Sequence, residues 1–469
     1  MTSTVAEGLP VVVIGAGPVG LAAAARLVER SLRPLLLERG PGAGAALEAW
    51  GHVRVFSPWA YNIDAAARSL LEGGGWRAPD PEALPTGHEL VRDYLAPLAA
   101  HPAIAPHVVL GATVEAVTRA GIDKVTSTGR EDAPFVVHWR DRDGAERRVE
   151  ARAVIDASGT WSAPNPMGVD GLAVAGERAA RDRIAYGIPD VLGRDRAAYA
   201  GRRVLVVGGG HSAINVALDL LRLEKEAPGT RVTWALRRDR FDRLLGGGIN
   251  DELPERGALG LAAKHAIEAG QLEMLAPFAA ERIAPNGDGL RVTARAAGRP
   301  MTLLVDRIVV ATGFRPELGM LRELRVALDA AVEAPPALAP LIDPNLHSCG
   351  TVPPHGAAEL AHPEPGFYIV GAKSYGRAPT FLMATGYEQV RSVVAEIAGD
   401  HAAAREVRLV LPETGVCSAA PISAAAGSGC CGGPAPAGVD ACCVLDSEAK
   451  AAGKAGCGCG TAVPDLASA

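Results

Sequence analysis

The chain has 469 residues, more than one hydrophobic core usually organises, so two or more domains are expected. Hydrophobic residues make up 48% of the chain and charged residues 21%, as in ordinary globular proteins. The formal charge of −6 is mild and no basic block occurs, which argues against a nucleic-acid partner.

The first motif lies near the N-terminus. The longest apolar run, residues 11–25, is broken by glycines, so it predicts a strand, a turn and a helix rather than a membrane span. Gly15 permits the tight turn, Gly17 lets a pyrophosphate approach the backbone, and Gly20 lets helix and strand pack closely. The next predicted strand ends in Glu38, whose carboxylate can accept hydrogen bonds from ribose hydroxyls. The early position of this motif, in a chain that carries a second one, favours FAD as its ligand.

Several segments between and after the motifs have clear periodicity. Residues 88–99 predict an amphipathic helix with Leu90, Val91, Tyr94 and Leu95 facing inward. Two short alternating segments, 134–140 and 289–293, predict strands of small antiparallel ribbons, and the last predicted helix spans residues 380–397.

The glycine motif recurs after an apolar strand at 204–207. The strand that follows ends in Arg237 and Arg238, at the position where the first motif has Glu38. Guanidinium groups offer a 2′-phosphate both charge and paired donors, so NADPH is preferred over NADH. The alternative is that the two arginines only end an exposed strand. The residues assigned to this NADPH site are Gly208, Gly210, Ser212, Ala213, Arg237 and Arg238.

With both motifs placed, the chain resembles the flavoproteins with two dinucleotide-binding domains, which include flavin-containing monooxygenases and disulfide reductases. Residues 155–159 (IDASG) and 308–313 (IVVATG) resemble the crossover segments of that group. The resemblance covers residues 10–400 and implies an α/β fold with two Rossmann-like domains. The FAD domain is expected to be discontinuous, with residues 1–165 and 315–411 flanking an inserted NADPH domain at 166–314.

Within that group the monooxygenase branch is more similar than the reductases. No CxxC lies near the flavin positions, and residues 50–59 (WGHVRVFSPW) fall where monooxygenase-like members carry aromatic and proline residues. Residues 171–187 contain no histidine, although the branch has one in its signature before the second motif. Besides Gly15, Gly17, Gly20 and Glu38, the residues assigned to cofactor binding are Pro18, Arg39, Trp50, Ser57, Val114, Gly159, Gly313, Gly371, Lys373 and Thr380.

The last FAD segment departs from the family pattern. Related proteins often end this strand in Gly-Asp, whereas here it ends in Gly371, Ala372 and Lys373. A helix beginning near 379–380 is expected to point its N-terminus at the flavin, where Lys373 or Arg377 would stabilise a reduced anionic flavin. The alternative is that Lys373 is an ordinary surface residue.

Residues 347–362 contain three histidines and a cysteine. His347, Cys349, His355 and His362 suggest a metal site, but their spacing matches no standard ligand pattern. We therefore interpret this proline-rich segment as a substrate-pocket wall or a cap on the FAD domain.

Seven of the eight cysteines lie beyond residue 412, where the chain has no aromatic residue. This composition predicts a disordered tail over residues 412–469. Paired thiolates suit a soft ion, such as trivalent arsenic, Hg(II) or Cu(I), although sequence drift is the alternative explanation. The low cysteine content of the rest favours the cytoplasm. The residues assigned to metal binding are Cys430, Cys431, Cys442, Cys443, Cys457 and Cys459.

The tail and residues 373–382 (KSYGRAPTFL) resemble the flavin-binding monooxygenases of bacterial arsenic-resistance operons. The leading hypothesis is therefore an FAD- and NADPH-dependent, monooxygenase-like oxidoreductase whose partner is a small molecule or a thiophilic metalloid such as arsenite. A homodimer is a candidate assembly, and no acid–base residue is assigned. Two alternatives remain open: a thiol–disulfide reductase that relays electrons through tail cysteines, and a soft-metal binding or delivery protein with a redox-sensing flavin domain.

Overall fold

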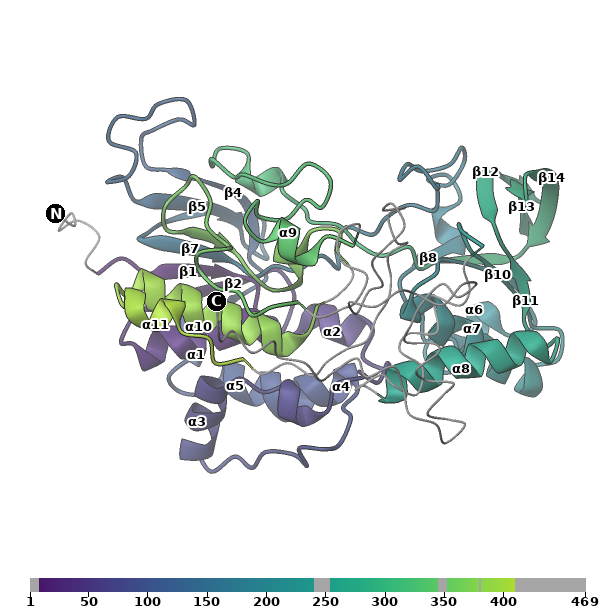
Figure 1. Ribbon diagram of the computed structural model, residues 1–469, viewed down its shortest axis with the longest axis horizontal. Coiled ribbons are helices and arrows are strands. Elements are labelled where there is room, and N and C mark those ends of the chain that lie inside the picture. The colour runs from purple at the N-terminus through teal and green to yellow at the C-terminus, as the bar shows by residue number, and fades with distance from the viewer. Residues whose placement is uncertain (1–7, 240–253, 345–351, 379–380, 410–469) are drawn as a thin grey trace, which may run out of the picture.

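Two five-stranded parallel sheets form the framework of the molecule, one in each of two lobes (Figure 1). This computed structural model describes residues 8–239, 254–344, 352–378 and 381–409. The predicted tail, with all six cysteines assigned to metal binding, lies outside the described residues, as does Thr380. Among the residues described, no helix is both long enough and apolar enough to cross a membrane.

The first sheet combines strands from both ends of the chain. Its order is β16-β7-β1-β2-β3, and all neighbouring strands are parallel. Because both faces are covered, its central strands are almost continuously apolar. Strand β16 follows the second lobe in sequence, so the predicted discontinuous domain is confirmed. The strands are β1 (Val11–Ile14), β2 (Pro34–Glu38), β3 (Val108–Leu110), β7 (Ala153–Asp156) and β16 (Phe367–Ile369).

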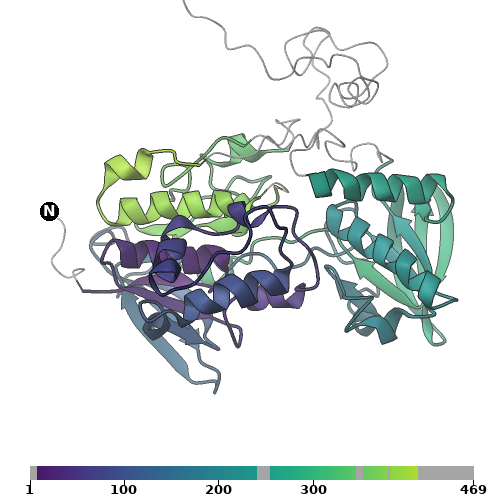
Figure 2. The same ribbon diagram turned by 90° about the horizontal axis from the view of Figure 1, so that it is seen from below.

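Helices cover one face of this sheet, and a three-stranded antiparallel sheet covers the other. Helices α1 and α10 pack side by side, and both lie against the sheet (Figures 1 and 2). The helices of this lobe are α1 (Pro18–Glu29), α2 (Ala45–Ala49), α3 (Ala65–Gly73), α4 (Gly87–Leu90), α5 (Ala96–Ala100), α9 (Ala339–Ile342), α10 (Met383–Ile397) and α11 (His401–Arg405). The antiparallel strands are β4 (Thr113–Arg119), β5 (Phe135–Arg140) and β6 (Glu146–Ala151).

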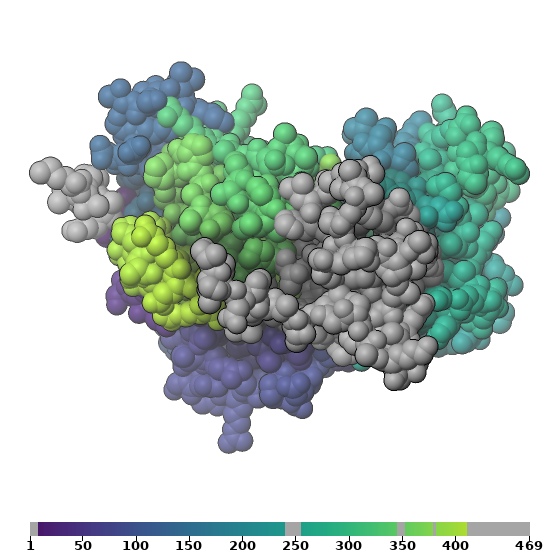
Figure 3. Space-filling view, in the orientation of Figure 1, coloured from purple at the N-terminus to yellow at the C-terminus, as the bar shows by residue number. Residues whose placement is uncertain are grey.

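The second lobe repeats this plan with the order β11-β10-β9-β15-β8, again parallel throughout. It lies at the opposite end of the molecule in the space-filling view (Figure 3). The residue limits of the domains stay predictions. The elements are β8 (Ile184–Tyr186), α6 (Arg196–Tyr199), β9 (Arg203–Val207), α7 (His211–Glu226), β10 (Arg231–Ala235), α8 (Pro254–Glu268), β11 (Glu273–Leu275) and β15 (Arg307–Val310), with an antiparallel sheet of β12 (Phe278–Asn286), β13 (Gly289–Ala296) and β14 (Arg299–Val305).

The two crossovers between the lobes run side by side. The Asn165 N–H donates to the Gly313 carbonyl at 2.9 Å, and the Arg315 N–H donates to the Ala163 carbonyl at the same distance. The rings of Trp161 and Phe314, one from each crossover, lie 4.8 Å apart. The lobes are therefore joined by a hydrogen-bonded pair of segments rather than by two independent linkers.

The predicted helix over 88–99 is interrupted by a π-helical turn at Val91–Leu95, between α4 and α5. Pro97 has no N–H to offer the Asp93 carbonyl, and the Trp76 indole N–H donates to that carbonyl at 2.8 Å instead. The four apolar side chains predicted to face inward are buried: Leu90, Val91, Tyr94 and Leu95.

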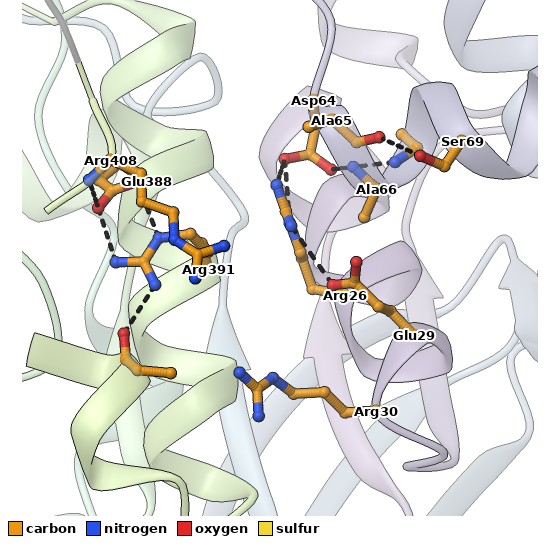
Figure 4. A network of polar contacts seen from close by, with 12 residues as sticks. Arg26, Glu29, Arg30, Asp64, Ala65, Ala66, Ser69, Glu388, Arg391 and Arg408 are labelled. Carbon is orange, nitrogen blue, oxygen red and sulfur yellow. Dashed lines mark hydrogen bonds and ion pairs between the residues drawn. The ribbon is translucent and has the colours of Figure 1, made fainter. Parts of the chain in front are cut away.

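Ion pairs tie the helices of the first lobe together (Figure 4). On α1, Arg26 pairs with the Asp64 carboxylate at 2.8 Å, and that carboxylate also accepts the Ala66 N–H at the start of α3. On α10, Glu388 pairs with Arg391 at 2.7 Å, and the Arg391 guanidinium also donates to the Ala403 carbonyl of α11 at 2.8 Å. These pairs fix the helices that cover the first sheet.

A second buried cluster joins the antiparallel sheet to the C-terminal part of this lobe. The Glu364 carboxylate, 1% exposed, pairs with Arg119 at 2.8 Å and with Arg130 at 2.6 Å. It also accepts the Arg325 N–H at 3.0 Å. Three segments distant in sequence therefore depend on one buried carboxylate.

Candidate functional site: two nucleotide cradles and a charged strand end

The first glycine turn has the three geometric features predicted for it. Gly15 has φ +98°, and a Cβ there would lie 2.9 Å from the Ala157 carbonyl oxygen. A Cβ at Gly20 would lie 1.9 Å from the Gly15 carbonyl oxygen, so only glycine permits this close packing of α1 on β1. A Cβ at Gly17 would meet nothing within 4 Å. Gly17 therefore leaves an open space at the N-terminus of α1, where a phosphate is favoured.

Glu38 holds this turn in place. One carboxylate oxygen accepts the Ala16 N–H at 2.7 Å, and the other accepts the Gly40 N–H at 2.6 Å. The half-buried carboxylate sits at the carboxyl end of β2, beside the turn. The contact of Glu38 with a ribose stays a prediction. The structure shows in addition that Glu38 organises the first glycine turn.

The second glycine turn is built in the same way. Gly208 has φ +143°, and a Cβ there would lie 2.2 Å from the Ala311 carbonyl oxygen. The Trp234 indole N–H donates to the Gly208 carbonyl at 2.7 Å and anchors the turn. A Cβ at Gly210 would meet nothing within 4 Å, whereas Ala213 is fully buried where α7 packs. The second lobe therefore also has an open space at a helix N-terminus, beside Gly210.

Arg237 and Arg238 lie just beyond the end of β10, and both are exposed. The Arg237 guanidinium donates to the Val169 carbonyl at 3.5 Å. Within the described part of the chain, no carboxylate pairs with Arg237, Arg238 or Arg377. Partial desolvation of the guanidinium, followed by the charges of Arg238 and Arg377, lowers the pKa of Arg237. Uncompensated positive charge at this strand end suits an anion such as a 2′-phosphate.

Lys373 is neither the free cation beside a flavin nor the surface residue that the sequence suggested. It is 1% exposed, so it is not a surface residue, and its ammonium is already paired with the Asp156 carboxylate at 2.7 Å. It also donates to the Ser158 hydroxyl at 3.0 Å. The attraction of the buried carboxylate draws the side chain towards β7, so Lys373 is not a free cation facing a flavin.

The helix expected near 379–380 begins later, at Met383. Leu382 precedes it in an extended conformation, with φ −114° and ψ 148°. The Phe381 ring packs edge-on against Tyr375 at 5.3 Å, and this packing keeps the approach to the helix extended.

The histidines of the proline-rich segment serve the protein core. His355 accepts a hydrogen bond from the Gln389 amide at 2.9 Å through Nε2, and its Nδ1 donates to the Pro353 carbonyl at 3.1 Å. Gln389 also accepts the Gly371 N–H at 2.7 Å, which fixes the turn after β16. No metal-ligand group occurs among the described residues, and His347 and Cys349 lie outside them. The interpretation as a cap on this lobe accounts for both described histidines.

The aromatic segment predicted near the flavin lies where the lobes meet. Phe56 packs edge-on against His211, the first residue of α7, with ring centroids 5.4 Å apart. The Ser57 hydroxyl donates to Asn62 at 2.9 Å within the first lobe. This segment therefore connects the first lobe to the N-terminus of the helix that follows the second glycine turn.

A family model described as pyridine nucleotide-disulphide oxidoreductase matches residues 12–340. The chain belongs to this family. Among curated proteins, a ferredoxin–NADP reductase of Thermus thermophilus is 26% identical over 360 residues, covering 74% of this chain and 85% of its own length. The indole-3-pyruvate monooxygenase YUCCA1 of Oryza sativa is 32% identical over 215 residues, covering 45% of each chain.

Solved structures share the fold of this family member. The bacillithiol disulfide reductase of Bacillus cereus has a TM-score of 0.61 at 20% identity and covers 83% of this chain and 99% of its own. The cadaverine monooxygenase DfoA of Erwinia amylovora has a TM-score of 0.58 at 15% identity, covering 86% and 98% respectively. The predicted fold class and the prediction of an NAD(P)H-dependent flavoprotein oxidoreductase with FAD and NADP(H) as cofactors are confirmed.

The two openings fit these cofactors. Gly17 and Gly210 each leave a helix N-terminus accessible, which is the requirement for binding the diphosphate of a dinucleotide. Of the other predicted residues, Pro18 begins α1, Ser212 lies in the first turn of α7, and Gly159 and Gly313 lie on the crossovers. Arg39 is exposed beside Glu38, while Trp50 and Val114 pack against the first lobe's apolar clusters. Their contacts with cofactor stay predictions.

The Gly17 opening can be tested by a single methyl group. We expect Gly17→Ala to leave the melting temperature of the FAD-free protein unchanged, because φ −78° suits alanine and its Cβ meets no protein atom. The methyl would occupy the phosphate space, so the Kd for FAD is expected to rise at least about tenfold. Gly73→Ala, also free of contacts, is the matched control in fluorescence titrations. An unchanged Kd would place the diphosphate elsewhere.

Reasoning from sequence missed Asp156, Ser158 and Gln389. Asp156 was visible only as one letter within a crossover motif, although an acidic residue ending an apolar strand was an available signal. Ser158 and Gln389 carried no signal of their own, because their roles depend on partners 215 and 18 residues away.

His362 gives the lobe a predictable response to acid. Burial lowers its pKa to about 4, although the Ala327 carbonyl and Asp156 oppose this change. The unfolded chain binds the proton below about pH 6.5, so the folded state is destabilised as pH falls from about 6.5 towards 4. By pH 5 this linkage costs about 2 kcal/mol. In urea unfolding at pH 7.5 and 5.0, we expect His362→Gln to lose about 2 kcal/mol less stability than the wild type.

The exposed His401 provides the control for this measurement. His401→Gln removes an imidazole that is paired with Glu396 at the surface, so the pH response should stay close to that of the wild type. Equal pH responses of the wild type and His362→Gln would contradict the assignment of the buried neutral ring.

Proposed function

We propose that this flavoprotein oxidoreductase uses NADPH in a monooxygenase-like reaction on a thiophilic substrate. Two observations together carry the proposal. The glycine turns at Gly17 and Gly210, called the two cradles, each leave a helix N-terminus open. The residues before the tail are almost free of cysteine. Residues 1–411 contain one cysteine, Cys349, so they cannot form an internal redox disulfide. Electrons from NADPH must therefore leave to oxygen, to an external acceptor or to the tail.

The preference for NADPH rests on Arg237 and Arg238. Among the described residues, no carboxylate pairs with either guanidinium group, and both lie at the end of β10, beside the second glycine turn. In this arrangement they bind the 2′-phosphate while α7 receives the diphosphate.

The protein's own part in the reaction is to bind and orient. FAD, when bound, supplies the redox chemistry. Glu38 holds the first glycine turn, and the paired crossovers fix the spacing of the two cradles. Phe56 and His211 close the contact between the lobes.

The tail supports the choice of a thiophilic substrate. Its six paired cysteines offer the soft ligands that arsenite prefers, and its sequence resembles proteins of arsenic-resistance operons. We propose that these thiolates capture the substrate. One atom of O₂ then goes to the substrate and the other leaves as water, while NADPH supplies a hydride (two electrons and one proton) and solvent supplies the second proton.

A thiol–disulfide reductase is the second candidate. It is favoured by the family to which the chain belongs and by the shared fold of the Bacillus cereus bacillithiol disulfide reductase. In that case tail cysteines would provide the dithiol that residues 1–411 lack.

One comparison separates the candidates. We expect arsenite to accelerate NADPH oxidation by the FAD-loaded protein in air, with O₂ consumed and little peroxide released. A variant with all six paired tail cysteines changed to serine should lose this acceleration and keep its basal NADPH oxidation. Anaerobic NADPH oxidation that produces titratable tail thiols would favour the reductase. Equal rates with and without arsenite in both proteins would contradict the thiophilic substrate.

A further inference from the structure

Ser158 lies at the point of the first sheet where a dinucleotide is expected to cross it. After β1 the chain adds β2 and β3 on one side and β7 on the other, so the topological switch point lies between β1 and β7. Asp156 ends β7 opposite Ile14, and Ser158 follows two residues later. A Cβ on Gly15 would lie 3.0 Å from the Ser158 Cα, so this segment directly borders the glycine turn.

The direction of the bound FAD follows from the same topology. Glu38, the predicted ribose contact, ends β2 on one side of β1. The diphosphate is expected at Gly17, so the rest of the molecule extends to the other side, past β7 and β16. Ser158 is exposed there, whereas Asp156 and Lys373 behind it are buried.

The hydrogen bonds of Ser158 restrict what its hydroxyl can bind. The Asp156 carboxylate can only accept, so the Ser158 hydroxyl donates to it at 2.6 Å. The Lys373 ammonium can only donate, so the Ser158 oxygen accepts its hydrogen bond at 3.0 Å with one of its two lone pairs. The remaining lone pair can accept one further hydrogen bond, and the hydroxyl has no proton left to give.

We propose that Ser158 binds a ribityl hydroxyl of FAD as an acceptor, and that Asp156 and Lys373 are positioning residues that orient it. A phosphate oxygen is excluded as partner at this atom, because phosphate also only accepts. A ribityl O–H is the donor that FAD carries between its diphosphate and its ring. The proposal rests on FAD binding at the first glycine turn. It extends the proposed function by naming the group of FAD that Ser158 binds.

The ion pair makes this acceptor rigid. Lys373 is 1% exposed and Asp156 is fully buried, so neither can turn to solvent without breaking a 2.7 Å bond. The Ser158 N–H also donates to Asp156 at 3.1 Å, which fixes the backbone together with the side chain. The acceptor is therefore in place before the cofactor binds.

The test uses the full-length protein and FAD analogues that lack one ribityl hydroxyl (2′-, 3′- or 4′-deoxy-FAD). We expect Ser158→Ala to raise the Kd for FAD about 2- to 10-fold. For one of the three analogues, removal of the hydroxyl should weaken binding to the wild type but cause no further loss in Ser158→Ala. Ser69→Ala, which removes an exposed helical hydroxyl, is the control and should leave every Kd unchanged.

The double variant Lys373→Met/Asp156→Asn tests the positioning role. It removes both charges together and keeps an amide oxygen for Ser158, so the FAD-free protein should melt close to the wild type. We expect its Kd for FAD to rise by a similar 2- to 10-fold, with a smaller discrimination against the deoxy analogue. A purely structural ion pair would leave FAD binding and discrimination unchanged in this variant.

The proposal would be overturned if Ser158→Ala bound FAD with the Kd of the wild type. It would also be overturned if each of the three deoxy analogues, relative to FAD, lost as much affinity for Ser158→Ala as for the wild type. Neither depends on turnover. Failure of the wild type to oxidise NADPH would contradict the proposed function and leave these affinity comparisons intact.

Discussion

Changing Arg237 and Arg238 together to glutamine is expected to raise the KM for NADPH about 10- to 100-fold. In the proposed NADPH site each guanidinium donates charge-assisted hydrogen bonds to the 2′-phosphate, and a tenfold change in KM corresponds to about 1.4 kcal/mol. The KM for NADH should change little, because NADH lacks that phosphate. Steady-state oxidation of both nucleotides, measured at fixed ionic strength, gives the ratio directly.

Lys225 provides a matched control for this double variant. It is an exposed cation near the C-terminal end of α7, away from the glycine turn. Lys225→Gln should keep the NADPH preference of the wild type. An unchanged NADPH-to-NADH ratio in the arginine variant would show that the two residues only end a strand.

Replacement of Glu364 by glutamine is expected to destabilise the first lobe by about 3–5 kcal/mol. The change leaves Arg119 and Arg130, each 4% exposed, without the charge that compensates them. Removing one partner of a buried ion pair is costly because the remaining charges stay desolvated. Urea unfolding of the full-length protein, followed at the lobe's own transition, measures the loss.

Glu115 supplies the comparison with an exposed pair. It contacts Arg140 at 3.0 Å on the surface of the antiparallel sheet, so Glu115→Gln should cost under about 1 kcal/mol. A similarly small cost for Glu364→Gln would contradict the view that one buried carboxylate joins the three segments.

The two cradles could be predicted from sequence because each depends on a short segment. A β-branched strand, a glycine turn and an alanine-rich helix are neighbours in the chain, and their geometry follows from local sterics. Gly20 shows this clearly, since a Cβ there would lie 1.9 Å from the carbonyl oxygen of Gly15 in the same turn. The split of the first domain was predictable in the same way, from the two crossover motifs.

The cluster of Asp156, Ser158 and Lys373 at the end of β7 could not be predicted, because its parts are distant in sequence. Lys373 and Asp156 are separated by 217 residues, and neither letter alone indicates a buried pair. The same applies to His355: the spacing of the histidines matched no metal pattern, but the bond of His355 to Gln389 became visible only in the fold. The start of α10 was placed too early for a related reason, because the packing of Phe381 on Tyr375 is tertiary.

Reduction of bound FAD by nicotinamide nucleotides is the most direct test of the central claim, that two cradles bind FAD and NADPH for one oxidoreductase. The full-length protein is loaded with FAD and mixed anaerobically with NADPH or NADH while the flavin absorbance near 450 nm is followed. The structure predicts rapid bleaching with NADPH and much slower bleaching with NADH at equal concentration. Absence of bound flavin, or absorbance unchanged by either nucleotide, would contradict it.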